Sequence, residues 1–169
     1  MHVAYLLRHA KSSWEDSGIP DDERPLAPRG RRAAAAIARH LEGQGIEPAL
    51  VLCSSARRTL ETLKPLRKVF SAKVEVSVEP GLYGASAQDL LHRLRAVPSP
   101  VPSVMVVGHN PGLQDLGLLL ARPSAQRRAL EAKFPTGALA VLRLDVVGWP
   151  DLAAGTAELA SITVPRELG

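Results

Sequence analysis

The 169-residue sequence predicts an α/β fold, a three-layer α/β/α sandwich with a mostly parallel central sheet and an antiparallel edge strand. Short apolar runs alternate along the chain with longer segments of helical period. This alternation is typical of strand–helix–strand units, which place helices on both faces of a parallel sheet. A chain of this length can form one hydrophobic core but is short for two, so we expect residues 1–169 to form a single domain.

Six segments are expected to form the sheet. The run 138–144 alternates like a strand, residues 145–150 make a turn, and residues 160–164 suit a partner strand at the sheet edge. Four short apolar runs indicate parallel strands, at residues 3–7, 49–53, 74–78 and 104–107.

Four helices are expected between these strands. The first runs from Pro28 to about Leu41, because proline suits the first helical position and glycines follow the end. The second begins near Ser54 or Ser55, and Pro65 should kink or end it.

The third helix covers residues 87–96, and the fourth opens at Asn110, a capping residue that precedes a proline. Residues 11–27 show no regular period and predict a loop folded over the site.

Composition narrows the function classes. The six aromatic residues are not interleaved with basic ones, so we expect no nucleic-acid partner despite the net charge of +4. No apolar stretch approaches the roughly 18 residues of a membrane span, and Arg8 interrupts the N-terminal one, which predicts neither membrane association nor a signal peptide. The single cysteine, Cys53, reads as a buried strand residue in a cytoplasmic protein.

Cationic and imidazole side chains follow three of the predicted parallel strands. The first strand ends in Arg8 and His9, the second leads into Arg58 in the first turn of a helix, and the fourth leads into His109. Because parallel strands end at one edge, these side chains are expected to converge. A dianionic phosphoryl group is the ligand that suits them, since guanidinium groups and helix N-termini bind anionic oxygens.

Histidines also bind metals, but the pattern here does not favour a metal site. His2, His40 and His92 lie at the chain start or in predicted helices, away from the sheet edge. No carboxylate accompanies His9 and His109 at a recognisable ligand spacing.

Six short motifs follow one another in a specific order, at residues 7–12, 24–30, 52–62, 82–84, 107–112 and 134–137. In the third of them Ser54, Arg58 and Thr62 keep the spacing S-x-x-x-R-x-x-x-T. With these motifs in this order, the chain resembles the histidine phosphatase superfamily, in the SixA-like phosphohistidine phosphatase branch of the phosphoglycerate mutase-like proteins.

The resemblance implies that His9 is the nucleophile and that no metal or cofactor is needed. It also implies that Arg8, Arg58 and His109 line the phosphate pocket, with Arg24 as a further contact from the loop. The same motifs make Ser54 and Asn110 candidates for substrate binding.

The expected function is a phosphatase with a phosphohistidine enzyme intermediate, acting on phosphohistidine in proteins. Mutase-like and many ester-cleaving relatives carry a glutamate four residues before the glycine matched here by Gly84. That position is Pro80 in this chain, and Glu79 beside it is a possible general acid. A general acid contributes roughly 10²–10⁴-fold, and a phosphoimidazole leaves with less help than an alkoxide. Two alternatives stay open: a small-molecule phosphomonoesterase that uses Glu79 or Asp89, and a phosphate-binding module without turnover.

Overall fold

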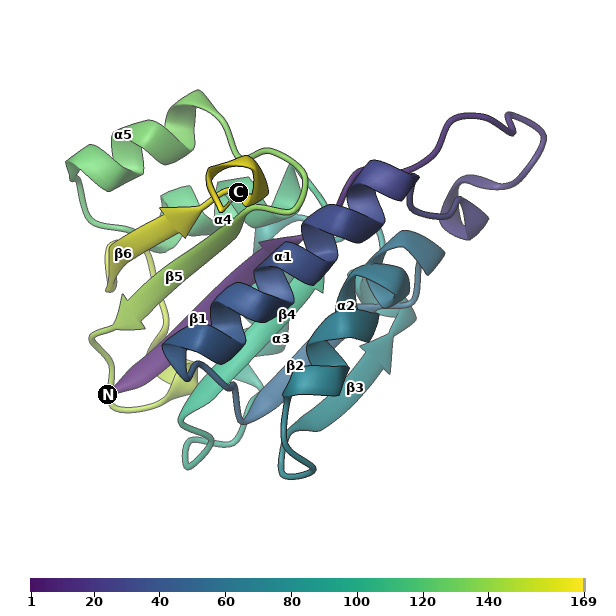
Figure 1. The fold of residues 1–169 in the computed structure, drawn as a ribbon. Helices are drawn as coiled ribbons and strands as arrows, with labels where there is room; N and C mark the ends of the chain where they lie inside the picture. Colours follow the sequence, from purple (N-terminus) through teal and green to yellow (C-terminus); the bar gives the residue numbers. More distant parts are fainter. Residues whose placement is uncertain (169) are drawn as a thin grey trace.

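The computed structural model describes residues 1–168, which are arranged around one six-stranded sheet (Figure 1). Its strands are β1 (His2–Arg8), β2 (Leu50–Ser54), β3 (Glu75–Glu79), β4 (Ser103–Gly108), β5 (Leu139–Leu144) and β6 (Ala157–Thr163). The order across the sheet is β3-β2-β4-β1-β5-β6. Strands far apart in sequence are therefore neighbours: β4 lies between β1 and β2.

Five strands run in the same direction. The pairs β1–β4, β2–β4 and β2–β3 are parallel, whereas β5 is antiparallel to both β1 and β6. The predicted α/β class with a mostly parallel sheet is confirmed. The strand that runs the opposite way is β5, one position in from the edge, and β6 covers it as the edge strand.

Helices cover both faces of the sheet. Figure 1 shows α1 and α2 on the near face and α3 and α4 behind the sheet. Apolar side chains of α1 and α2, among them Leu41 and Leu66, pack on one face, while Leu94 and Leu116 of α3 and α4 pack on the other. The helices are α1 (Pro28–Gln44), α2 (Arg57–Val69), α3 (Ala87–Arg95), α4 (Gly112–Leu120) and α5 (Ala125–Ala132).

The end of α2 and the presence of α5 differ from expectation. Pro65 was expected to kink or end its helix, and the second of these is excluded, since α2 continues to Val69: buried Leu63 and Leu66 hold the segments on both sides of the proline against the sheet. That burial outweighs the helix hydrogen bond that proline cannot make. Helix α5 was not expected. It buries a single residue, Leu130, so its apolar residues do not show the helical periodicity from which a helix is predicted.

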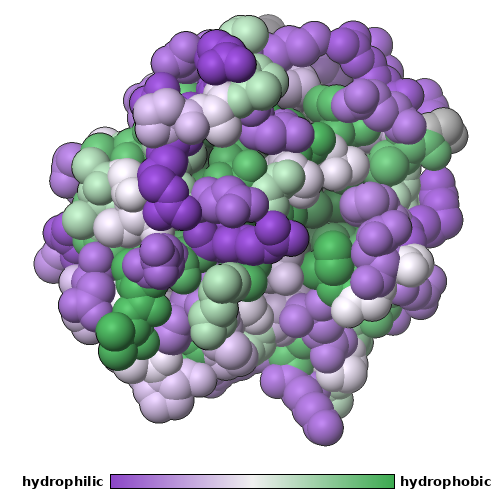
Figure 2. Space-filling view, turned by 90° about the vertical axis from the view of Figure 1, so that its left-hand side faces the viewer, coloured by the Kyte–Doolittle hydropathy of each residue, from purple (hydrophilic) through white to green (hydrophobic). Residues whose placement is uncertain are grey.

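The long segment between β1 and α1 is a loop, as expected, with a 3-10 turn at Asp21–Glu23 and a bridge from Ser12 to Leu26. Cys53 is fully buried in β2, which confirms its reading as a strand residue. The side of the molecule that carries α5 and β6 is mostly hydrophilic, with hydrophobic residues in small separate groups (Figure 2). Within residues 1–168 no helix is both long and apolar enough to cross a membrane.

Candidate active site

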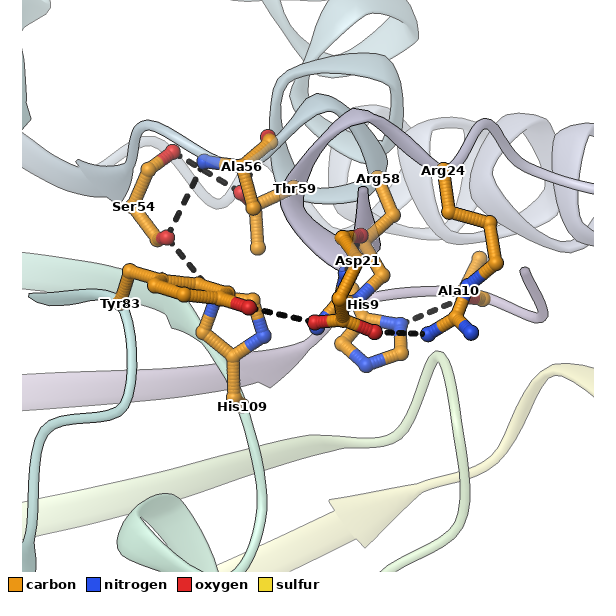
Figure 3. Close-up of polar contacts among 10 residues, drawn as sticks. All are labelled: His9, Ala10, Asp21, Arg24, Ser54, Ala56, Arg58, Thr59, Tyr83 and His109. Carbon is orange, nitrogen blue, oxygen red and sulfur yellow. Dashed lines mark hydrogen bonds and ion pairs between the residues drawn. The ribbon is translucent and has the colours of Figure 1, made fainter. Parts of the chain in front are cut away.

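Strand register brings the two imidazoles together. Arg8 of β1 pairs with Gly108 of β4, so the next residues, His9 and His109, leave adjacent strands at the same edge. The backbone N–H of His9 donates to the carbonyl of Gly108 at 3.0 Å. The two ring centroids are 5.4 Å apart (Figure 3). The expected convergence of His9 and His109 is therefore found in the structure.

His9 is held in one tautomer. Its Nδ1 lies 2.7 Å from the carbonyl oxygen of Ala10, which can only accept, so we assign the ring proton to Nδ1 and the lone pair to Nε2. Burial lowers the pKa of His9 to about 4, the nearby charges of Arg58 and then Arg8 and Arg24 lower it too, and the Ala10 hydrogen bond acts in the opposite direction. The ring is thus neutral at pH 7.

His109 is oriented by Ser54. Its Nε2 lies 2.8 Å from the Ser54 hydroxyl oxygen, which also accepts the backbone N–H of Ala56 at 3.3 Å. Ser54 is fully buried, and Nε2 is the acceptor within reach of its hydroxyl among the described residues, so we assign the hydroxyl proton as donating to Nε2 and the ring proton of His109 to Nδ1. Nδ1 is turned toward His9 in Figure 3 and has no hydrogen-bond partner among residues 1–168. Burial, followed by the charges of His9 and Arg58, lowers the pKa of His109 to about 3.

Three guanidinium groups surround the imidazoles. Arg8 comes from the end of β1, Arg24 from the loop before α1, and Arg58 from the first turn of α2. Arg24 and Arg58 are only 8% and 7% exposed. The Nε groups of Arg8 and Arg24 are buried without an acceptor among residues 1–168. Buried, unpaired donors are costly, and an anion with several oxygens is the ligand that would satisfy them.

A carboxylate that the sequence did not single out lies between these arginines. Asp21 Oδ1 is 2.7 Å from Nη2 of Arg24, and its Oδ2 is 3.1 Å from Nη2 of Arg58. Tyr83 donates its hydroxyl proton to Oδ2 at 2.5 Å (Figure 3). This hydrogen bond and the two arginines hold the pKa of Asp21 below its usual value. The only sequence signal is an acidic run before Arg24, which is equally typical of a solvated loop.

The spacing of Ser54, Arg58 and Thr62 has a structural basis in α2. Thr62 Oγ1 accepts the backbone N–H of Ala10 at 3.0 Å and donates to the carbonyl of Arg58 at 2.7 Å. Ser54 ends β2, Arg58 and Thr62 lie one turn apart in α2, and all three are buried. Thr62 therefore ties the turn after His9 to the helix that carries Arg58, a role that sequence reasoning missed.

Asn110 lies beside the site but is engaged by the protein. Its Nδ2 donates to the carbonyl of Phe134 at 3.2 Å and to Oε1 of Gln114 at 3.1 Å, while its Oδ1 accepts the Gln114 N–H. The Phe134 carbonyl also accepts from Nη1 of Arg8 at 2.9 Å. Asn110 thus links the start of α4 to the loop that orients Arg8, and its contact with substrate stays a prediction.

Glu79 ends β3 and is held by α3. Nε and Nη2 of Arg93 donate to its two carboxylate oxygens at 2.7 and 2.8 Å, and Ser77 donates to one of them. Arg93 lowers the pKa of Glu79. Asp89 instead caps α3 through a reciprocal pair of hydrogen bonds with Ser86. Use of Glu79 as a general acid stays a prediction.

Within residues 1–168 no group of three or more histidine, cysteine, aspartate or glutamate side chains is arranged to hold a metal ion. Residues 4–97 match the family model of the histidine phosphatase superfamily, branch 1. The chain belongs to the histidine phosphatase superfamily. The predicted resemblance is confirmed, and the match covers more than half of the chain, including His9, Arg24 and Arg58.

Several other proteins match this chain over nearly its full length. An uncharacterized protein of Mycobacterium tuberculosis is 37% identical over 165 residues, covering 95% of this chain and all of that protein. A structure from Nakamurella multipartitia named after the phosphohistidine phosphatase SixA has 33% identity and a TM-score of 0.84, covering 96% of this chain and 95% of that one. A SixA-named structure from Agrobacterium tumefaciens has 29% identity and a TM-score of 0.82, covering 97% and 98%.

Proposed function

We propose that this protein is a phosphatase that forms a phosphohistidine intermediate on His9 and hydrolyses phosphohistidine in proteins. The observation that carries the proposal is the state of His9. Its ring is buried and neutral, its Nδ1–H is fixed by the Ala10 carbonyl, and three guanidinium groups lie around it. A free imidazole lone pair beside a site for a dianion is suited to attack phosphorus.

In the proposed first step, Arg8, Arg24 and Arg58 bind the oxygens of the phosphoryl group. Arginines stay charged throughout, so they neutralise the transition state without titrating. Nε2 of His9 attacks phosphorus, and the new P–N bond forms as the bond between phosphorus and the substrate nitrogen breaks. The substrate imidazole, protonated on its other nitrogen, leaves as a neutral ring.

In the second step, water attacks phosphorus and the P–N bond to His9 breaks. Inorganic phosphate leaves, the proton of the attacking water passes to solvent, and the His9 lone pair is restored. We assign His109 as a neutral donor throughout, because Ser54 occupies its Nε2 and leaves the Nδ1–H for a phosphoryl oxygen.

The surrounding carboxylates favour a phosphoramidate over an alkyl ester. Arg93 holds Glu79 and lowers its pKa, and Asp21, which does lie at the site, also has a lowered pKa. Both are ionised at pH 7 and have no proton to give. An alkoxide leaving group would lose a contribution of roughly 10²–10⁴-fold, whereas a neutral imidazole leaves without that help. The sequence identity of 33% and 29% with the two SixA-named proteins supports phosphohistidine as the substrate class.

The mechanism is tested by trapping the intermediate. The enzyme is mixed briefly with a radiolabelled phosphoramidate and quenched in alkaline detergent, because phosphohistidine is acid-labile. We expect label on the parent protein and none on His9→Asn, together with at least a thousandfold loss of turnover, on the order of what loss of a nucleophile costs. Unchanged turnover in His9→Asn would reject the mechanism.

Substrate class is tested by comparing a phosphoramidate with an alkyl phosphate at equal concentration. We expect the phosphoramidate to be hydrolysed faster by about two orders of magnitude, and Glu79→Gln to keep the parent rate on it. A preference for the ester that disappears in Glu79→Gln would instead indicate a small-molecule phosphomonoesterase. Tight phosphate binding without hydrolysis of either compound would indicate a binding module.

A further inference from the structure

A groove of about 800 Å³ lies beside the proposed phosphate pocket, between α1, the loop after α5 and the C-terminal segment. The two sites are linked along the chain: Phe134, whose carbonyl accepts from Arg8, lies between the groove residues Lys133 and Pro135, and Lys11 of the groove follows His9 by two residues. The charged lining residues of the groove are all basic, and none of the described lining residues is acidic. They are Lys11, Arg29, Arg32, Arg39, Lys133 and Arg166.

Three of these cations form a row on α1. Arg29, Arg32 and Arg39 are exposed and share the groove side of the helix with Ala33 and Ala36. At about 1.5 Å of rise per residue, the row is about 15 Å long. That length exceeds the reach of one small anion and suits a chain that carries several negative charges.

The groove cations have no carboxylate partner among the described residues; this also holds for Arg67, Arg122 and Arg128, whereas some other arginines are paired. Elsewhere Arg57, Arg127 and Arg143 each form an ion pair with a glutamate at 2.7–3.1 Å. Within residues 1–168 no lining cation of the groove has a carboxylate within ion-pair distance. Like charges left together repel one another, and an acidic ligand would reverse that repulsion.

The floor of the groove is apolar, which favours a peptide as the ligand. It is formed by half-buried apolar residues, among them Ala33, Ala36, Pro135, Val164 and Pro165. An apolar floor with a cationic rim matches a segment in which carboxylates alternate with apolar side chains. A nucleic acid would gain little here, because no aromatic side chain of the described lining is available for base stacking.

We propose that this groove docks an acidic segment of the protein whose phosphoryl group enters the His9 pocket. That the docked protein is the phosphorylated substrate rests on the proposed function. That the groove binds an acidic segment does not depend on it. Docking beside the pocket would raise the local concentration of the phosphoryl group at His9 without any new contact to phosphate.

The test is a binding measurement that requires no turnover. The probe is a fluorescent peptide of about eight residues in which glutamate and leucine alternate, long enough to span the row. Its anisotropy is followed at low ionic strength with the parent, with Arg32→Glu/Arg39→Glu, and with Lys64→Glu/Arg67→Glu. The last variant makes the same change in net charge on exposed positions of α2, outside the groove.

We expect Arg32→Glu/Arg39→Glu to bind the peptide at least about tenfold more weakly than the control variant. Lys133→Glu/Arg166→Glu, which alters the opposite wall, should show the same loss and serves if the α1 variant does not fold. Equal binding by groove and control variants would overturn the inference. So would displacement of the peptide by a short DNA duplex at lower concentration than by unlabelled peptide.

The outcome is separable from that of the proposed function. If the protein hydrolyses no phosphohistidine yet the groove variants selectively lose the peptide, the docking site stands and only the function is rejected. If hydrolysis is found and the groove variants bind as the control does, the function stands and the docking site is rejected.

Discussion

At the residue scale, the chemistry of His9 and His109 is set by burial and by fixed partners. The Ala10 carbonyl selects the His9 tautomer, and the Ser54 hydroxyl selects that of His109. Both rings are kept neutral, because burial and neighbouring cations disfavour the charged form. Neutrality has a thermodynamic consequence, since the unfolded chain binds protons at these histidines that the folded chain does not.

The first prediction concerns stability at acidic pH. The folded pKa of about 4 for His9 and about 3 for His109 lie below the unfolded value of about 6.5. As pH falls below 6.5, only the unfolded state gains protons, so the free energy of unfolding should decrease, on the order of a few kcal/mol by pH 4. Urea denaturation between pH 7 and 4 measures it. His9→Asn/His109→Asn should show a flatter profile, and an identical slope would contradict the assignment.

The second prediction concerns Asp21. Its carboxylate bridges Arg24 and Arg58, the cations proposed to bind phosphate, so a phosphoryl group must displace it or approach beside a like charge. Asp21→Asn should therefore strengthen competitive inhibition by inorganic phosphate roughly threefold to tenfold. Asp22→Asn changes the adjacent exposed carboxyl and is the matched control. Weaker inhibition by phosphate in Asp21→Asn, seen as a larger inhibition constant, would show that Asp21 instead positions the arginines.

At the scale of elements, the N-terminus of α1 is fixed by its contact with the turn after β1. Gly30 lies so close to that turn that an added Cβ would meet the carbonyl oxygen of Lys11 at 2.1 Å. The helix therefore packs directly on the backbone that follows His9. Because backbone atoms cannot give way as a flexible side chain can, a methyl group there must displace the helix.

The third prediction uses two glycines of this helix. Gly30→Ala should lower the free energy of unfolding by about 1–3 kcal/mol and reduce phosphatase turnover, since the His9 turn must shift. Gly43→Ala should raise the free energy of unfolding by up to about 1 kcal/mol, because alanine has the higher helix propensity and nothing lies within 4 Å of the added Cβ. Chemical denaturation and a turnover assay measure both variants. Equal stabilities would contradict the close packing of Gly30.

At the scale of the whole molecule, the proposed phosphate pocket joins parts distant in sequence. Arg8 belongs to β1, Arg24 to the long loop and Arg58 to α2, so an anion bound by all three links three elements. A ligand that binds only the folded state stabilises the entire fold.

The fourth prediction follows from this linkage. Inorganic phosphate at about 100 times its Kd should stabilise the parent by about 2.7 kcal/mol, which raises Tm by several degrees for a chain of this size. Arg58→Gln should lose most of this shift. Arg57→Gln should keep it, because Arg57 is exposed and pairs with Glu61. Equal phosphate-induced shifts in the two variants, measured by thermal unfolding, would place the anion elsewhere.

The sequence by itself determined the α/β class and the residues that meet at the sheet edge. Strand and helix periods are local properties, and parallel strands necessarily end at one edge, so His9, Arg58 and His109 could be brought together from spacing alone. Pro65 and α5 show the limit of local reasoning, since Leu63 and Leu66 hold α2 through the proline and α5 carries little apolar period.

Only the tertiary structure decided which polar groups meet within the site. The ion pair of Asp21 with Arg58, the ion pair of Glu79 with Arg93 and the cationic groove beside α1 all join separate segments, and no regular spacing in the sequence predicts that these segments meet. Irregular loops take their course from packing against the rest of the fold, and the pKa values of His9 and His109 follow from burial, a property of the folded molecule alone.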